Sequence, residues 1–99
     1  MANWYTEEVR ELFEAILTLE NTEECRVFFE DVCTVNEIRE IAQRLRVAKL
    51  LRKKTSYAVI NAQTGVSTAT ISRVSRCLEY GSGGYPLVLD RLEREDDDG

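Results

Sequence analysis

The fold is decided by the stretch SYAVINAQTGVSTATISRVSRCLEY, residues 56–80. It contains two helical patterns separated by a three-residue break, in which Gly65 can end the first helix with a positive φ and Ser67 can cap the second. The apolar residues of both helices and of the break are spaced so that they share one seam: Ile60, Val66, Ile71 and Val74. This arrangement predicts a helix-turn-helix.

The second of these helices is predicted to expose small polar and basic side chains, which suit a DNA major groove. These are Thr68, Ala69, Thr70, Ser72, Arg73 and Arg76. The pattern alone is equally compatible with two ordinary packed helices. Asn61 argues against a close crossing, because a small residue is usual at its position. The choice therefore depends on the rest of the chain.

The length and composition are those of one folded domain. The chain has 99 residues, of which 43% are hydrophobic and 31% charged, and this balance is not that of a disordered protein. We expect a single helical domain over residues 1–95 and an acidic, disordered tail over 96–99. There is no run of membrane-spanning length and no signal pattern. The sequence therefore predicts a cytoplasmic protein without a membrane partner.

The residue types that usually carry catalysis and metal binding are scarce. The chain has no histidine, which removes the commonest general base and the commonest transition-metal ligand. Cys25, Cys33 and Cys77 fall within apolar helical stripes, and we expect them to be buried free thiols. No two of them have the close spacing of a zinc site. We therefore expect neither an enzyme nor a cofactor.

Charge is distributed unevenly along the chain. The net charge is −5, yet residues 44–78 contain eight basic and no acidic side chains. Part of this block lies at the end of a long helix predicted over about Val35 to Lys53. Its cations are Lys49, Arg52, Lys53 and Lys54. Cations there compensate the helix dipole, or they anchor phosphates of a bound nucleic acid. Their place directly before the predicted helix-turn-helix favours phosphate anchoring.

Six helices account for the whole pattern. Thr6 can cap a first helix that ends near Glu20, the pairs Asn21–Glu24 and Thr34–Glu37 are capping boxes for the next two, and Pro86 suits the first turn of the last. The third helix is expected to bury Ile38, Ile41, Ala42, Leu45, Ala48 and Leu51. The first and last helices are more apolar than one small domain can bury, so we prefer a two-fold dimer to a compact monomer.

Two of these segments, RLRVAKLLR at 44–52 and TATISRVSRCL at 68–78, resemble the Trp repressor superfamily. They are more similar to its YerC/YecD-like branch than to the tryptophan-responsive repressors. The resemblance covers nearly the whole chain except the tail. It implies an all-α, six-helix Trp-repressor-like domain that forms an intertwined homodimer with a helix-turn-helix on each side.

The resemblance also implies which residues meet double-stranded DNA. Positions on the second helix of the motif would read bases, positions on the first helix would approach the duplex, and the cations would meet phosphates. The first helix lacks the basic side chains of the repressors, so the same operator is not expected. The predicted DNA-binding residues are Lys53, Lys54, Ser56, Tyr57, Ala58, Asn61, Ser67, Thr68, Ala69, Thr70, Ser72, Arg73 and Arg76.

A separate question is whether a small effector binds. Family repressors hold an indole between two arginines, and Arg44 and Arg73 match these positions, with Thr34 nearby. However, Val74 stands where those repressors have glycine, and Cys77 replaces a serine. Tryptophan is therefore expected to fit poorly, and we favour ligand-free DNA binding or an unknown small effector.

The leading hypothesis is a sequence-specific DNA-binding transcriptional regulator, a homodimer that represses by occupying its site. Two alternatives belong to other classes of protein. One is a protein-binding adaptor of the transcription machinery, which would leave Trp4, Tyr5 and the last helix exposed for its partner. The other is an effector-sensing helical domain without DNA contact.

Overall fold

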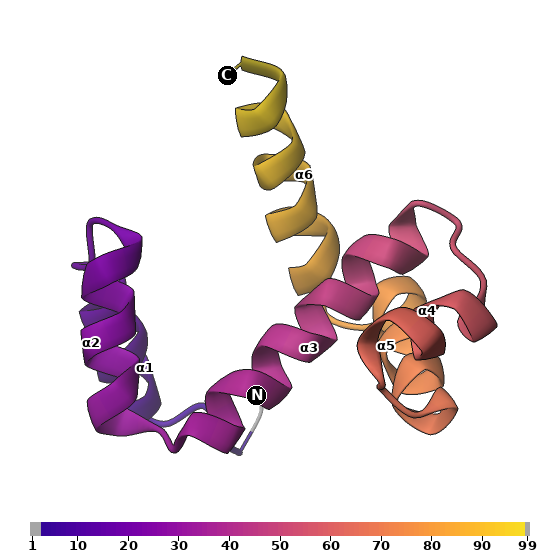
Figure 1. Cartoon of the computed structure of the whole chain (residues 1–99). Helices are drawn as coiled ribbons and strands as arrows, with labels where there is room; N and C mark the ends of the chain where they lie inside the picture. Colours follow the sequence, from indigo (N-terminus) through magenta and orange to yellow (C-terminus); the bar gives the residue numbers. More distant parts are fainter. Residues whose placement is uncertain (1–2, 99) are drawn as a thin grey trace. The chain divides into compact units, whose positions relative to one another are not determined.

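The computed structural model describes residues 3–98, and this part of the chain is all-helical, without a strand. The six helices follow one another in the predicted order (Figure 1). Their bounds are α1 Glu7–Ile16, α2 Thr22–Val32, α3 Val35–Arg52, α4 Tyr57–Thr64, α5 Thr68–Tyr80 and α6 Gly84–Asp98. The predicted all-α fold is therefore confirmed. Within the described range, no helix is long and apolar enough to cross a membrane.

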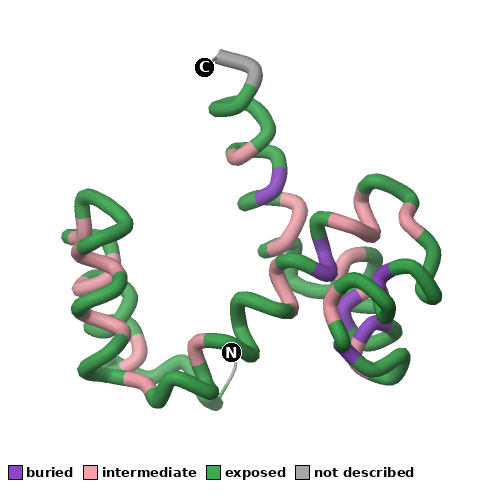
Figure 2. Tube along the Cα trace, viewed as in Figure 1, coloured by how far each residue is buried: buried purple, intermediate pink, exposed green. Residues whose placement is uncertain are grey.

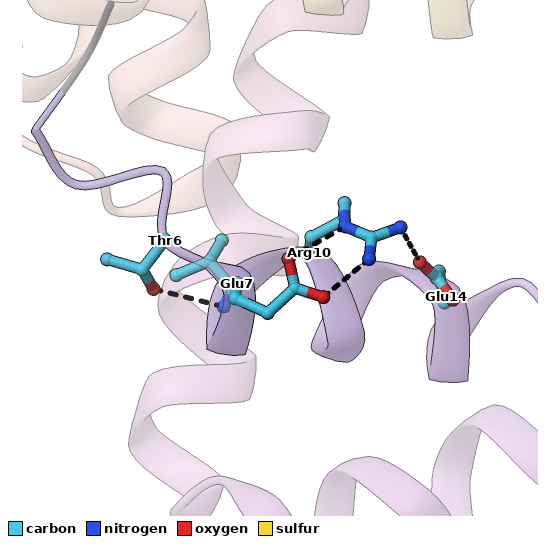
Figure 3. Close-up of polar contacts among 5 residues, drawn as sticks. Thr6, Glu7, Arg10 and Glu14 are labelled. Carbon is cyan, nitrogen blue, oxygen red and sulfur yellow. Dashed lines mark hydrogen bonds and ion pairs between the residues drawn. The ribbon is translucent and has the colours of Figure 1, made fainter.

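The chain divides into two compact units, residues 1–38 and 39–99. In the first unit, the Thr6 side chain caps α1 by accepting from the Val9 amide, and Arg10 pairs with Glu7 and Glu14 (Figure 3). α1 ends at Ile16, four residues before the predicted end. The reason is local, because the amide and the hydroxyl of Thr18 both donate to the Ala15 carbonyl and tighten the last turn.

The predicted Thr34–Glu37 capping box forms in full, whereas in the Asn21–Glu24 pair Asn21 caps the helix but the Glu24 carboxylate accepts from the Glu20 amide. Asn21 accepts from the Glu24 amide at 2.9 Å, and Thr34 accepts from the Glu37 amide at 3.1 Å. The Glu37 carboxylate in turn accepts from the Thr34 amide at 2.8 Å. These contacts, the backbone amide of Thr34 first, hold the pKa of Glu37 below its ordinary value of 4.5. The entry into α3 is thus fixed by residues adjacent in sequence.

The second unit contains the buried core (Figure 2). Seven hydrophobic side chains from four helices and one turn are buried there: Val47, Ala48, Ile60, Val66, Ile71, Val74 and Leu89. The set includes all four residues of the predicted helix-turn-helix seam. That prediction is confirmed.

The expected core face of α3 is only partly right. Ala48 is buried as expected, but so is Val47, which was not in the predicted set. Ile41 is 52% exposed and Ala42 is also exposed. Among the residues that the structure describes, the buried core includes only Val47 and Ala48 of α3, both from its C-terminal half.

Two further expectations need correction. The three cysteines are free, but Cys25 and Cys33 are half-buried and Cys77 is exposed. Cys77 lies at the edge of the stripe by which α5 contacts the core, so the helix turns its thiol outward. α6 extends to Asp98, so residues 96–98, expected in a disordered tail, are helical, whereas Gly99 lies outside the described residues.

Candidate nucleic-acid interface

The turn between α4 and α5 is held by side chains as well as by glycine. Gly65 has the left-handed φ of 74° expected for the end of a helix, and its amide donates to the Asn61 carbonyl at 2.9 Å. The Asn61 side-chain amide donates to the Val66 carbonyl at 2.8 Å. The hydroxyl of Thr64 accepts from the Val66 amide at 3.1 Å. Asn61 therefore secures the turn, although its size argued against the motif.

Three of the predicted DNA-binding residues set the starts of the two helices. Ser56 caps α4 by accepting from the Val59 amide, and Ser67 caps α5 by accepting from the Thr70 amide at 3.2 Å. The Ser67 hydroxyl also lies 3.1 Å from the Thr70 hydroxyl, to which it donates. Thr70 is half-buried. The caps fix the direction in which α5 leaves the turn.

α5 has one buried face and one exposed face. Ile71 and Val74 are 0% and 1% exposed and lie in the core. The opposite face exposes the predicted residues Thr68, Ala69, Ser72, Arg73 and Arg76. Among the side chains of residues 3–96, neither of these arginines forms an ion pair. The helix therefore offers hydroxyl, methyl and guanidinium groups to solvent along one side.

The start of α4 exposes the remaining predicted contacts. Tyr57 is 39% exposed, and Ala58 and Asn61 are exposed as well. The amide of Asn61 is nevertheless engaged with the turn, so it is less free to bond to a base than Tyr57.

The corner between α3 and α4 has a backbone feature that the sequence did not indicate. Lys54 adopts a left-handed conformation with a φ of 65°, the one non-glycine residue with a positive φ among the described residues. Its amide donates to the Leu51 carbonyl at 2.9 Å, and the Thr55 amide donates to the Leu50 carbonyl at 3.1 Å. This is a Schellman motif, in which glycine is the usual residue. A glycine would have signalled the turn, whereas a lysine gives no such signal.

The cations at the end of α3 differ in their surroundings. Lys53 and Lys54 are exposed. Arg52 pairs instead with two carboxylates of α6, with Asp90 and, at 3.2 Å, with Glu93. One cation of the predicted phosphate-anchoring cluster thus joins two helices of the second unit.

The residues predicted for an effector pocket have different environments. In the first unit, Thr34 is engaged in its capping box. In the second unit, Val74 is buried in the core, and Arg73 and Cys77 are exposed. Arg44 is half-buried and borders a cavity of about 360 Å³. Its other lining residues are Glu40, Gln43, Gly65, Val66, Ser67 and Thr70.

A second cavity, of about 460 Å³, was not foreseen from the sequence. It lies between α3 and α4, and its lining includes two arginines, Arg39 and Arg46. Over the described range, the structure contains no group of three or more His, Cys, Asp or Glu residues that could hold a metal ion.

Comparisons with known proteins give a consistent result. The Trp repressor protein family matches residues 7–93. The uncharacterized protein YerC of Bacillus subtilis (strain 168) is 54% identical over 86 residues, which cover 87% of this chain and 83% of YerC. A TrpR-like protein from Eubacterium eligens ATCC 27750 superposes with a TM-score of 0.87 and 53% identity, over 90% of this chain and 92% of that one. A Staphylococcus aureus protein described provisionally as a Trp repressor gives a TM-score of 0.85 and 53% identity, over 89% and 88% of the two chains.

Proposed function

Because the chain belongs to the Trp repressor family, a family of DNA-binding regulators, we propose that it is a sequence-specific regulator that binds duplex DNA as a homodimer. The helix-turn-helix of each copy would enter the major groove at one half of a palindromic site. Repression would follow from occupancy of the site.

The observation that carries this proposal is the two-sided character of α5. Its apolar side is committed to the core through Ile71 and Val74, so the helix cannot turn its other side inward. That other side carries Thr68, Ala69 and Ser72, whose hydroxyl and methyl groups suit base edges in the major groove. Because its start is fixed by the Ser67 cap and its exposed side carries these groups, α5 is the part of the chain best suited to read a DNA sequence.

The individual roles follow from the surroundings of each side chain. Ala69 can contact a thymine methyl, and Ser72 can bond to several bases. Thr70 was expected to read bases directly, but its hydroxyl is bonded to that of Ser67, so we assign it to positioning the start of α5. Phosphate contacts are assigned to the four exposed cations Lys53, Lys54, Arg73 and Arg76.

A homodimer is favoured by the apolar surface that one chain leaves uncovered. In the first unit, Leu17 is 82% exposed and Val32 is 55% exposed, and on α6 Leu87 is 49% exposed. Such surface is costly to expose to water, and a second copy would cover it by the same residues on both sides. Sedimentation velocity tests this proposal; a monomer at micromolar concentration would contradict it.

Selection of bound duplexes from a random pool tests the function as a whole. We expect the enriched sequences to contain two half-sites related by a dyad. Affinity for them should fall steeply with salt, by close to one unit of log affinity per log salt for each phosphate contact. A pool that shows no enrichment would refute sequence-specific binding, and a salt-independent affinity would refute the roles of the four cations.

An effector is the second candidate function, and the cavity beside Arg44 favours it. A volume of about 360 Å³ is within the range of small-molecule sites. Tryptophan is not the expected effector, because Val74 stands where the tryptophan-responsive repressors have glycine, although Val74 lies in the core and does not border this cavity. A thermal-shift screen of small metabolites tests the idea, since a ligand of the native state raises the melting temperature. Stabilisation by tryptophan would contradict the argument from Val74.

A further inference from the structure

The C-terminal helix brings carboxylates to the cations at the end of α3. Arg52, whose side chain is 32% exposed, pairs with Asp90 and with Glu93 of α6. The residues are far apart in sequence, so the contact depends on how α6 packs in the second unit. Both carboxylates remain more than half exposed. The pairs are therefore accessible to solvent and ions.

A small cavity of about 150 Å³ continues this arrangement. From α3 it is bordered by Lys49 and Lys53, and from α6 by Glu93 and Asp96, together with Leu89 and Leu92. Three cations of the predicted phosphate-anchoring cluster thus lie beside acidic side chains of α6. Lys54, the fourth, is not among the residues that border this cavity or pair with α6.

The charge of α6 is unfavourable for the helix itself. Residues 93–98 contain five acidic residues and one basic residue, although the C-terminal end of a helix favours cations. Acidic residues at this end destabilise the helix locally. Within the second unit, Arg52 of α3 pairs with Glu93, and Lys49 and Lys53 border a cavity with Glu93 and Asp96.

We propose that the C-terminal half of α6 is an internal competitor of nucleic-acid phosphates for Lys49, Arg52 and Lys53. In the free protein, Arg52 is paired with Asp90 and Glu93, and Lys49 and Lys53 border the cavity that Glu93 and Asp96 also border. On a duplex, phosphates replace the carboxylates, and Lys49 and Arg52 become contacts in addition to those already assigned. The inference rests on the proposed DNA binding, since the duplex is the displacing polyanion.

Exchange of this kind is physically easy. Exposed ion pairs contribute little net free energy, and they are screened by salt. The phosphate backbone presents a dense row of negative charge, and each cation that meets it releases a counterion. The acidic helix therefore lowers affinity for any polyanion without preventing binding to a duplex that also satisfies α5.

The test removes charge from α6 without changing its size. We compare E93Q/D96N with the control E8Q/E11Q, which changes the net charge equally at two exposed carboxylates of α1 that form no ion pair among the side chains of residues 3–96. Fluorescence anisotropy gives the affinity for a duplex over a series of salt concentrations. We expect E93Q/D96N to bind about threefold to tenfold more tightly, because it removes the Arg52–Glu93 pair in each copy of the proposed dimer, and each exposed pair contributes at most about a factor of five. The control should change affinity by less than about twofold.

Retention on heparin separates this inference from the proposed function, because heparin is a polyanion without base sequence. Stronger retention of E93Q/D96N than of E8Q/E11Q supports the competition even if no duplex is selected from a random pool. Equal retention and equal affinity of the two variants overturn it, even if an operator is found. Circular dichroism checks that α6 remains helical. If E93Q/D96N is unfolded, D96N alone replaces it, since this variant leaves both partners of Arg52 intact. D96N must then increase duplex affinity and heparin retention, by less than is expected for E93Q/D96N.

Discussion

Lys54 provides a substitution whose effects on stability and on DNA binding should have opposite signs. The residue combines a left-handed backbone with an exposed positive charge at the corner before α4. Replacing it by glycine should relieve the backbone and remove a phosphate contact. Replacing it by alanine should remove the contact and keep the strain.

The expected magnitudes follow from the backbone geometry. A non-glycine residue at a φ of 65° costs about 1–2 kcal/mol. Glycine offsets about 0.5–1 kcal/mol of this gain in stability, because it is more flexible in the unfolded chain and loses more conformational entropy on folding. K54G should therefore be about 0.5–1 kcal/mol more stable than K54A, which is a difference of about 2–8 °C in melting temperature. The lost interaction with the helix dipole is common to both variants and cancels.

DNA binding should be affected alike in the two variants. Each should bind more weakly than the wild type, and the slope of log affinity against log salt should be shallower by about 0.9 per copy. Thermal denaturation and anisotropy titrations measure the two quantities on the same samples.

Either measurement can refute the reasoning separately. If K54G is no more stable than K54A, the backbone of Lys54 is not strained. If the salt dependence of both variants equals that of the wild type, Lys54 does not contact phosphate. A loss of affinity in K54G alone would mean that the fixed backbone matters for binding, and the assignment of Lys54 to charge would be wrong.

Three further predictions concern the turn between α4 and α5, the exposed side of α5 and the start of α3. N61A should lower the free energy of unfolding by about 1–3 kcal/mol in urea denaturation, because the part-buried carbonyl of Val66 loses its donor; a smaller loss would mean that water replaces the amide. S72A should change the preference among duplexes in a selection experiment, whereas R76Q should weaken binding to all of them alike; the reverse pattern would exchange the two roles. The pKa of Glu37 is lowered in the folded state, so its stabilising effect is complete above its ordinary value of 4.5 and is lost as the pH falls through the folded value. Acid should therefore destabilise the wild type more than E37Q, and equal pH profiles in thermal denaturation would contradict this.

Features that depend on neighbours in sequence could be predicted from the sequence. The left-handed Gly65, the Ser67 cap and the Thr34–Glu37 capping box each involve residues within a few positions of one another. The buried seam of the helix-turn-helix follows from helical periodicity. These signals were sufficient for the fold and for the location of the candidate interface.

Features that depend on distant packing could not be predicted. The pairing of Arg52 with Asp90 requires the position of α6, which no local pattern contains. The outward thiol of Cys77 and the exposed Ile41 depend on which part of a helix the rest of the chain covers. Lys54 gave no signal because a lysine in the left-handed conformation is rare.

The buried core has consequences for how the protein responds to its own concentration. Seven side chains make up the interior of one copy within the described residues, a small interior for a chain of 99 residues. If the second copy supplies the missing cover, folding and association are one equilibrium, and the melting temperature rises with protein concentration. Dilution would then act as a denaturant, and the amount of protein made by the cell would set the folded fraction.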